Sequence, residues 1–402
     1  MRRSPMVVAL GLLILCGAAL QAQDRIDGDG FALRNQPPAR ATPLLKGLIA
    51  AAFNETHKAE KLLPPLIAKA PKSPAAAQAR EALIGLYFRQ GAYRQALRWI
   101  DSALAASPDD AGLTSTRVLA GSVAKHPDQR STTSPSTAAS HLREGNIFVS
   151  VRANKQPGEY ILDSGASISV TNESEARRLG MKIESADGSI PLSGAAGGSI
   201  SYRLATLDRL EIGGAALLNV AFMVVSDDTL PFAELPKGQR AILGIPVLLG
   251  LRTMRIRPTG EQMEIGFASQ RLKYSHANLC FDGPVPLLLA AFQDKELHMS
   301  LDTGGAHSDL YSRFGASFAA YVATHGRKGS YRQRGVDGSK QLESIDLDEA
   351  ALSIDRRTLL LRPAHILDEP KNSPLHGRLG MDALFQAKVL TLDWGAMRLR
   401  LE

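Results

Sequence analysis

Apolar and polar residues recur with two different spacings along this chain. Between residues 42 and 125 the sequence is rich in alanine and leucine, and Leu83, Tyr87 and Ile100 fall near helical spacing. From residue 142 onward, short apolar runs alternate with polar turns, which predicts strands. The pattern therefore predicts a helical region followed by a mainly β region.

The helical region carries a repeat-like pattern. Residues 82–108 place Tyr87 and Gly91-Ala92-Tyr93 between two helical stretches. This arrangement resembles a tetratricopeptide repeat, which implies a helix-turn-helix unit. Residues 42–70 predict a preceding helical pair, interrupted at Pro64-Pro65. We expect the region either to present a binding face to a protein partner or simply to pack on the rest of the chain.

A polar segment separates the two regions. Residues 126–141 are rich in Ser, Thr and Pro and show no apolar periodicity. This composition is typical of a linker, so we expect an irregular connection there.

The β region contains an internal repeat. Two predicted strands separated by a polar turn lead into Asp163-Ser164-Gly165, and two more lead into Asp302-Thr303-Gly304, 139 positions further on. The strands are expected at 146–152, 159–162, 285–292 and 297–301. An apolar strand that runs into Asp-Ser/Thr-Gly places one carboxylate at a tight turn, and two copies suggest a pair of carboxylates that meet across a two-fold axis.

A second feature recurs in register with the first. The segments Ile242-Leu243-Gly244 and Arg378-Leu379-Gly380 end 81 and 78 residues after the two aspartates. Each precedes a predicted terminal hairpin, at 254–267 and at 389–401. Two features that recur in register over about a hundred residues indicate a duplicated lobe.

Here the chain resembles the aspartic peptidase superfamily, and most closely bacterial retropepsin-like lobes fused in tandem, as in pepsin-like enzymes. The resemblance implies a multidomain chain with a mainly β bilobal fold, lobe 1 at 142–270 and lobe 2 at 271–402, preceded by the helical domain at 42–125. Arg378 departs from the apolar residue that the family carries at its position.

The resemblance also implies a chemistry. Asp163 and Asp302 would form a catalytic dyad that acts on an extended polypeptide substrate. Two carboxylates about 4 Å apart repel by roughly 4 kcal/mol at an effective dielectric of about 20, so such a pair holds one proton over a broad pH range. The ionised member activates a water as general base, and the protonated member polarises the scissile carbonyl. Neither a metal nor a cofactor is expected.

Residues beside the two aspartates have implied supporting roles. In the family, the hydroxyls at Ser164 and Thr303 hydrogen-bond across the dyad and hold both loops rigid. Gly165 and Gly304 let the two backbones approach closely. Ala166 stands where pepsin-like enzymes carry a hydroxyl that donates to the aspartate, so we expect an activity optimum less acidic than that of digestive enzymes.

Each lobe is expected to carry a flap. The stretch 193–199, with Gly197 and Gly198, and the stretch 335–339, with Gly335 and Gly338, predict flexible hairpin tips. Such tips would close over a bound peptide and exclude water. An ordinary surface turn is the alternative at any single position.

The N-terminus predicts export. Arg2 and Arg3 precede an apolar run of 15 residues, fewer than the roughly 18 that a membrane span needs. Small residues follow, so we expect a signal peptide at 1–22 and a periplasmic or secreted protein. Lipid anchoring at Cys16 is the alternative, although the preceding Leu15 stands where lipoprotein signals carry a small residue.

Composition limits the other classes of function. Cys280 is the only cysteine outside the signal segment, and we expect it to be buried rather than nucleophilic. The net charge of +7 is modest for 402 residues. The densest basic stretch, 327–334, has no stacked aromatics, so nucleic-acid binding is not favoured and a solvated loop is expected. The sequence does not indicate an oligomeric state.

Two functions from different classes fit these observations. The first is an exported aspartic endopeptidase, a hydrolase. The alternative is a non-catalytic peptide- or protein-binding module that joins a peptidase-like body to a helical adaptor. The second aspartate loop, with Gly305 and Ala306, has no hydroxyl before Ser308, which motivates the alternative. Retention of both aspartates favours the enzyme, because a binder has no need of them.

Overall fold

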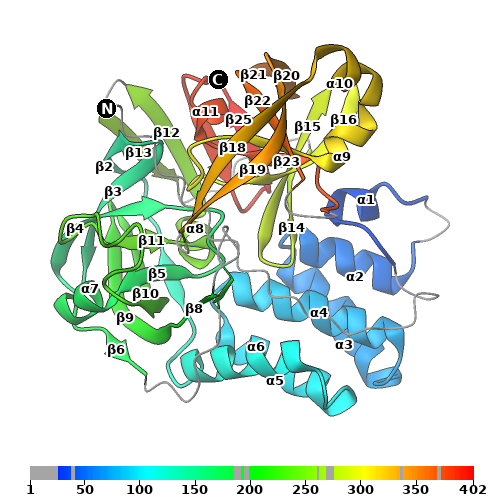
Figure 1. Ribbon diagram of the computed structural model, residues 1–402. Helices are drawn as coiled ribbons and strands as arrows, with labels where there is room; N and C mark the ends of the chain where they lie inside the picture. Colours follow the sequence, from blue (N-terminus) through cyan, green and yellow to red (C-terminus); the bar gives the residue numbers. More distant parts are fainter. Residues whose placement is uncertain are drawn as a thin grey trace.

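The computed structural model describes residues 26–37, 41–184, 192–193, 199–259, 262–268, 276–335, 338–368 and 373–402. These residues form a helical region and two mainly β parts, each built around a large sheet, which are named lobe 1 (up to residue 270) and lobe 2 (from residue 271) (Figure 1). Helices α2 to α6 lie together beneath lobe 2 and beside lobe 1 in this view. No helix in the described ranges is long and apolar enough to cross a membrane.

The helical region begins with a short helix and continues through five longer ones. They are α1 (Gly30–Arg34), α2 (Pro43–Ala52), α3 (Thr56–Lys69), α4 (Pro74–Arg89), α5 (Tyr93–Ala106) and α6 (Ala111–Val123). The starts of α2 and α4 are set by Thr42 and Ser73, whose side chains accept a backbone N–H at 3.2 Å, with proline at the first helical position.

One local expectation in this region is wrong. Pro64-Pro65 does not interrupt the helix, because α3 continues through both prolines to Lys69. The fixed φ of proline is compatible with helical backbone, and α3 packs against both α2 and α4. Tertiary packing thus outweighs the loss of two backbone donors.

Lobe 1 is built on one large sheet that carries two short helices. Its strands are β1 (Arg130–Thr132), β2 (Ser136–Arg143), β3 (Asn146–Ala153), β4 (Gln156–Leu162), β5 (Ser169–Asn172), β6 (Lys182–Ile183), β7 (Leu192–Ser193), β8 (Ser199–Ile200), β9 (Arg203–Ile212), β10 (Ala215–Val225), β11 (Ala241–Leu243), β12 (Thr253–Thr259) and β13 (Gln262–Ala268). Its helices are α7 (Glu173–Arg178) and α8 (Ile245–Leu251). Strands β7 and β8 pair only with each other, as a separate two-stranded sheet.

Lobe 2 repeats this arrangement around a second sheet. Its strands are β14 (Leu279–Asp282), β15 (Val285–Phe292), β16 (Lys295–Leu301), β17 (Asp309–Tyr311), β18 (Arg327–Gly335), β19 (Gly338–Leu347), β20 (Ala350–Ile354), β21 (Arg357–Leu361), β22 (Ala364–Leu367), β23 (Gly377–Leu379), β24 (Leu390–Asp393) and β25 (Arg398–Leu401). Its helices are α9 (Ser312–Ser317), α10 (Ala319–His325) and α11 (Met381–Leu384). The predicted strands that lead to each aspartate are confirmed as β3, β4, β15 and β16.

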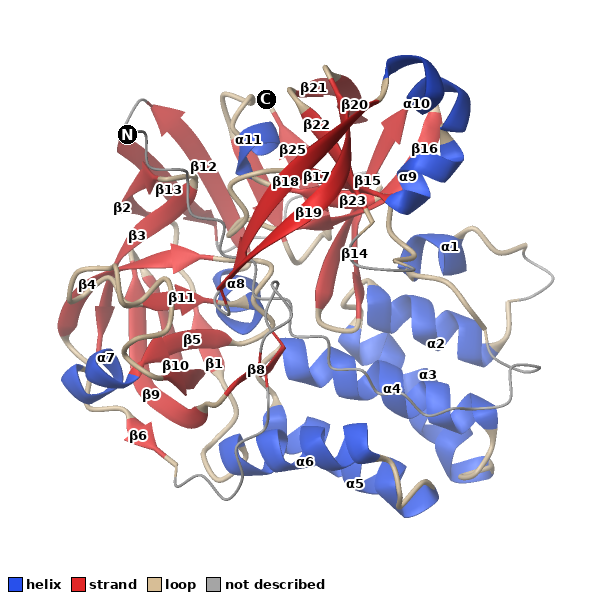
Figure 2. Cartoon of the chain, in the orientation of Figure 1, coloured by secondary structure: helices blue, strands red, loops and turns tan. Residues whose placement is uncertain are grey.

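The two lobes are joined by strand pairing as well as by the chain. The predicted terminal hairpins are confirmed as β12–β13 and β24–β25, and β12 pairs antiparallel with β24. The large sheet therefore continues from lobe 1 into the last strands of lobe 2 (Figure 2).

The segment 126–141 is not the irregular linker that its composition suggests. β1 pairs with β10, and β2 pairs with both β13 and β3. Backbone pairing depends little on side-chain chemistry, so Ser and Thr residues complete the sheet wherever neighbouring strands present free backbone groups. The segment thus belongs to lobe 1.

The helical region is attached to both lobes. Its apolar residues share one core with the inner face of lobe 1. Arg89 on α4 reaches lobe 2, where it donates to Gly283 O at 3.1 Å and lies 4.7 Å from the Phe281 ring centroid. On α1, the N-cap residue Asp29 lies 2.5 Å from His298 Nδ1 on β16. These contacts fix the helices against the body of the protein.

Candidate active site

The two aspartates occupy equivalent places at the ends of β4 and β16. Asp163 N donates to Leu243 O and Asp302 N donates to Leu379 O, both at 3.0 Å. In each lobe the strand before the aspartate pairs parallel with the strand that ends just before Gly244 or Gly380: β4 pairs with β11, and β16 pairs with β23. The same backbone arrangement therefore presents both aspartates.

The residues that follow the aspartates hold the two loops together by reciprocal hydrogen bonds. Ser164 N donates to Thr303 Oγ1 at 2.9 Å, and Thr303 N donates to Ser164 Oγ at 3.0 Å. Each hydroxyl then donates to a backbone carbonyl of the opposite lobe, Ser164 Oγ to Leu301 O at 2.8 Å and Thr303 Oγ1 to Leu162 O at 3.0 Å. All four bonds are buried, so the two loops form one rigid unit.

Gly165 and Gly304 lie where a side chain would collide with the carboxyl groups. A Cβ at Gly165 would lie 2.7 Å from Asp302 Oδ1 and 3.1 Å from Asp163 Oδ1. A Cβ at Gly304 would lie 2.5 Å from both Asp163 carboxyl oxygens. Both carboxyls thus converge on the same small space, and only glycine leaves room for them there.

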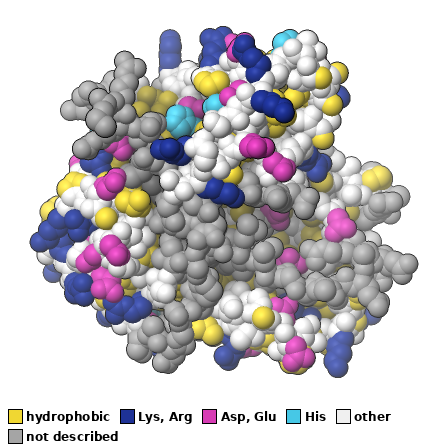
Figure 3. Space-filling model, viewed as in Figure 1, with side chains coloured by type: hydrophobic (Ala, Val, Ile, Leu, Met, Phe, Trp, Pro, Cys, Tyr) yellow, Lys and Arg dark blue, Asp and Glu magenta, His cyan; other side chains and the backbone are white. Residues whose placement is uncertain are grey.

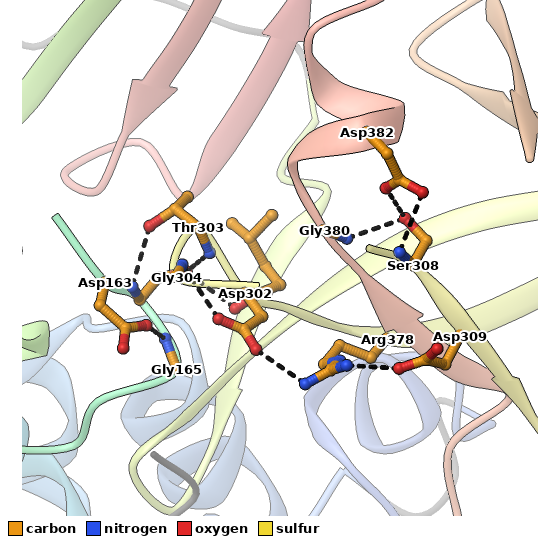
Figure 4. Close-up of polar contacts among 12 residues, drawn as sticks. Asp163, Gly165, Asp302, Thr303, Gly304, Ser308, Asp309, Arg378, Gly380 and Asp382 are labelled. Carbon is orange, nitrogen blue, oxygen red and sulfur yellow. Dashed lines mark hydrogen bonds and ion pairs between the residues drawn. The ribbon is translucent and has the colours of Figure 1, made fainter. Parts of the chain in front are cut away.

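The carboxyls of Asp163 and Asp302 are buried, and both lie beside Gly165 (Figure 4). Burial raises the pKa of Asp163 well above its usual range, and the charge of Asp302 raises it further. The pKa of Asp302 is also raised by burial, but Arg378 opposes that rise. Two buried carboxyls this close cannot both ionise readily, so the pair is suited to hold a single proton.

Backbone amides replace the hydroxyl donors that the sequence lacks. Gly165 N donates to Asp163 Oδ1 at 2.7 Å, and Gly304 N donates to Asp302 Oδ1 at 3.0 Å. The N–H groups of Ala166 and Gly305 also lower the pKa of their aspartates. The Ser308 hydroxyl bonds to other groups and not to Asp302: its Oγ accepts from Gly380 N at 2.9 Å and lies 2.6 Å from Asp382 Oδ1.

Arg378 and Asp309 belong to the candidate site, although the sequence did not predict them there. Arg378 is buried, its Nη1 donates to Asp302 Oδ2 at 3.2 Å, and its Nη2 pairs with Asp309 Oδ2 (Figure 4). One feature of the sequence could have indicated this ion pair: Arg378 is a charged residue at a position, two before Gly380, that is apolar in the family pattern. Asp309 gave no signal of its own, because only the fold places it beside Arg378.

The flap candidates fall partly outside the described residues. Gly197 and Gly198 lie outside them, between the paired strands β7 and β8. Gly335 and Gly338 are opposite each other at the end of the β18–β19 hairpin, whose two connecting residues are not described. The hairpin reaches from lobe 2 toward the centre of the molecule in Figure 2.

The basic stretch 327–334 lies on strand β18 and not on the solvated loop that was expected. On the face shown in Figure 3, Lys and Arg side chains over lobe 2 are interspersed with Asp and Glu. Arg327, for example, pairs with Asp348. The strand pairs along its length with β19, which explains the regular structure.

Other polar features lie away from the aspartates. Cavities of about 420 and 530 Å³ are lined by the helical region together with, respectively, the β14–β15 turn and residues near Trp394. Among the described residues no group of three or more His, Cys, Asp or Glu is arranged to hold a metal ion. Cys280 is buried, as expected, and burial raises the pKa of its thiol.

Comparison with known proteins supports an aspartic peptidase relationship for part of the chain. A family model described as "Aspartyl protease" matches residues 149–251, which include Asp163. No curated protein gives a significant match.

Solved structures with similarity to the chain were also found. Basic 7S globulin from soybean has 10% identity and a TM-score of 0.40, over 67% of this chain and 94% of the other. Conglutin gamma from lupine seeds has 11% identity and a TM-score of 0.38, with the same coverage. A retropepsin-like aspartic protease from Rickettsia conorii has 18% identity and a TM-score of 0.22, over 34% of this chain and 97% of the other. These TM-scores are all below 0.5.

Proposed function

We propose that this protein is an exported aspartic endopeptidase that hydrolyses peptide bonds through a water activated by Asp163 and Asp302. The observation that carries the proposal is the pair of buried carboxyls beside Gly165, on two loops that the reciprocal Ser164–Thr303 hydrogen bonds join. The match of residues 149–251 to the aspartyl protease family supports it. A peptide-binding module would have no need of two carboxyls held against each other at the cost of burial.

In the proposed reaction one carboxylate removes a proton from water as the water oxygen attacks the scissile carbonyl carbon. The protonated carboxyl gives its proton to the carbonyl oxygen, which yields a tetrahedral diol. The diol then collapses: one of its hydroxyls returns a proton to the ionised carboxylate, and the protonated carboxyl gives its proton to the nitrogen. The C–N bond breaks, and the products are an amine and a carboxylic acid. The pair finishes with one proton, as it began.

The substrate is proposed to bind as an extended strand. β18 forms one edge of the lobe 2 sheet within the described residues, so its outer backbone groups are available to a peptide. An added strand along the β18–β19 hairpin would gain backbone hydrogen bonds with little dependence on side-chain identity.

The direct test is cleavage of an unfolded polypeptide by the purified protein between about pH 3 and pH 8, a range that brackets shifted carboxyl titrations. Wild type is expected to cut, and Asp163→Asn and Asp302→Asn are each expected to abolish cutting. Asp294→Asn is the matched control, because Asp294 is exposed in the β15–β16 turn and Asn tolerates its positive φ.

Two outcomes would contradict the proposal. Wild type that cuts nothing at any pH would favour the binding module. Activity that survives in either dyad variant would show that another group performs the hydrolysis.

Export is a separate part of the proposal, because residues 1–25 lie outside the described structure. Cleavage of the expected signal peptide would leave a mature chain that begins at Gln23. Mass spectrometry of the protein recovered from the periplasm or medium of a bacterial host would show that mass. A mass that corresponds to a chain beginning at a lipid-modified Cys16 would contradict this expectation and would indicate a membrane-anchored protein.

A further inference from the structure

Lobe 2 carries an ion pair where lobe 1 carries an apolar pair. Arg378 on β23 is opposite Asp309 on β17 in the antiparallel register. The matching position in lobe 1, two residues before Gly244, is Ile242, which is opposite Val170 on β5. All four paired side chains are buried. The two lobes therefore differ in charge at a place where their backbones are equivalent.

The ion pair of lobe 2 extends to the aspartate pair. Arg378 Nη1 lies 3.2 Å from Asp302 Oδ2, and its side chain is 7% exposed. A guanidinium keeps its proton even when buried, and a charge-assisted hydrogen bond is strong where water is excluded. The positive charge beside Asp302 is thus permanent over the whole range in which carboxyls titrate.

The hydrogen bonds around the two aspartates are unequal. Both oxygens of Asp302 receive donors, Oδ1 from Gly304 N and Oδ2 from Arg378. Asp163 Oδ1 receives Gly165 N, whereas Asp163 Oδ2 is buried with no hydrogen-bond partner among the described residues. An ionised carboxylate is an acceptor only and a protonated one carries a donor. The donors therefore favour a carboxylate at Asp302 and a proton on Asp163 Oδ2.

The other titratable groups around Asp302 do not reverse this asymmetry. Tyr331 on β18 and Tyr311 on β17 have raised pKa values, to about 12 for Tyr311, because both are buried, so they are neutral where carboxyls titrate. Asp309 is paired with Arg378, and Asp382 at the start of α11 lies against Ser308. Among the described residues, the charged or titratable side chains that interact with Asp302 or with its neighbours around Arg378 are Asp163, Asp309, Tyr311, Tyr331, Arg378 and Asp382.

We propose that the Arg378–Asp309 pair makes the dyad asymmetric: it holds Asp302 ionised and leaves the shared proton on Asp163. This rests on the proposed peptidase function and assigns its two roles. Asp302 removes the proton from water, and Asp163 gives its proton to the carbonyl oxygen. Arg378 is a positioning residue that acts through Asp302, and it extends the singly protonated, active state toward acid pH.

The test is a titration that does not depend on activity. The carboxyl carbons of aspartate are labelled with ¹³C, and the Asp302 signal is identified as the one absent from Asp302→Asn. Wild type is compared with Arg378→Ile and with Asp309→Val, which introduce the two lobe 1 residues one at a time. The double variant Arg378→Ile/Asp309→Val places the whole lobe 1 pair in lobe 2.

The two single variants are expected to move the Asp302 midpoint in opposite directions. Arg378→Ile removes the cation and leaves Asp309 unpaired, so the midpoint should rise by about 1 to 3 pH units. Asp309→Val leaves Arg378 to Asp302 alone, so the midpoint should fall. The double variant should rise by less than Arg378→Ile does. Arg378→Lys should keep most of the wild-type midpoint, and Tyr331→Phe should leave it unchanged.

Several results would overturn the proposal. Shifts of the same sign in both single variants would indicate general structural damage and not an electrostatic role. A double variant with the wild-type midpoint would show that the pair does not act on Asp302. If Arg378→Ile fails to fold, the double variant still decides, because its pair already packs in lobe 1.

The activity profile separates this inference from the proposed function. In an active enzyme the acid-side limb of kcat/KM should move to higher pH in Arg378→Ile and to lower pH in Asp309→Val, parallel to the carboxyl titrations. Wild type without activity, but with the expected titration shifts, would refute the peptidase and leave the charge assignment standing. Peptidase activity whose pH limbs do not move in either variant would support the peptidase and refute the charge assignment.

Discussion

The two aspartate loops share their backbone design and differ in the strands behind them. In both lobes an aspartate N–H bonds to a leucine carbonyl at 3.0 Å, and the Ser164 and Thr303 side chains exchange equivalent bonds. Behind Asp302, however, Arg378 and Asp309 replace an apolar pair. The duplicated backbone thus places both carboxyls beside Gly165, whereas the Arg378–Asp309 pair, present in one lobe only, determines which carboxyl carries the charge.

The largest expected effect comes from the glycines that both loops share. Gly304→Ala places a Cβ 2.5 Å from both Asp163 carboxyl oxygens, which must displace that carboxyl. A misplacement of about 1 Å can lower a catalytic rate by about 100-fold, so kcat should fall at least that far. The kcat of Gly165→Ala should fall by a smaller factor, because the new Cβ would lie 2.7 Å from its nearest atom, Asp302 Oδ1.

The control for this comparison is Gly121→Ala on α6, where a new Cβ meets nothing within 4 Å. Its kcat should match wild type. Equal activity in Gly304→Ala and wild type would mean that the carboxyls have room to move, which contradicts the tight convergence of the two loops.

Removal of the reciprocal hydrogen bonds from either side should lower the unfolding free energy by a similar amount. Ser164→Ala leaves Thr303 N and Leu301 O without partners, and Thr303→Val leaves Ser164 N and Leu162 O in the same state. An unsatisfied buried group costs about 1–3 kcal/mol, so each variant should lose roughly 2–4 kcal/mol of unfolding free energy in urea. A loss confined to one variant would break the equivalence of the lobes.

The pH dependence of stability should differ between the two aspartates. The pKa of Asp163 is raised in the folded protein by burial and by Asp302. The folded state therefore binds this proton more tightly, and stability falls as pH rises from the unfolded value of about 3.8 through the folded value. Asp163→Asn removes this loss, so it should be more stable than wild type at neutral pH but not at pH 3.

Asp302→Asn provides the contrast, because it takes an ionised partner from Arg378. It should therefore show less gain at neutral pH than Asp163→Asn does, or a net loss. Urea unfolding of both variants at several pH values measures the difference. Identical pH profiles would contradict the asymmetry between the two carboxyls.

The smallest effect is expected at the serines behind the loops. Ser308 Oγ accepts from Gly380 N and contacts Asp382, whereas the equivalent Ser169 Oγ accepts from Gly244 N at 3.1 Å. A hydrogen bond contributes about 1 kcal/mol, and more when it involves a charge. Ser308→Ala should thus lower the unfolding free energy by about 2 kcal/mol, and Ser169→Ala by about 1 kcal/mol. A larger loss for Ser169→Ala would reverse the comparison.

The sequence predicted those parts of the fold that depend on local pattern. Alternating apolar runs gave the strands that lead to each aspartate, and the recurrence of Asp-Ser/Thr-Gly located both loops. The same reasoning failed where distant segments decide the outcome. The Ser- and Thr-rich stretch at 126–141 became strands because β10, β13 and β3 offered partners.

Some residues of the candidate site could likewise be predicted from local sequence, and others could not. Ser164, Thr303, Gly165 and Gly304 could be named because each follows its aspartate directly along the chain. The pairing of Arg378 with Asp309 could not, because the two residues are 69 positions apart and meet only when β17 and β23 align. A charged residue in an apolar slot signals that a partner must exist, but it does not say which residue that partner is.

By itself, then, the sequence determined that this chain has two copies of a strand-and-turn unit, each with one carboxylate, after a helical region. Only the tertiary structure decided that both carboxyls lie beside Gly165, that a cation lies beside one of them, and that the helical region packs against both lobes. The physical reason is the distance along the chain over which each kind of interaction acts. Strand and turn preferences act between neighbouring residues, whereas burial and charge depend on which distant segments the fold brings together.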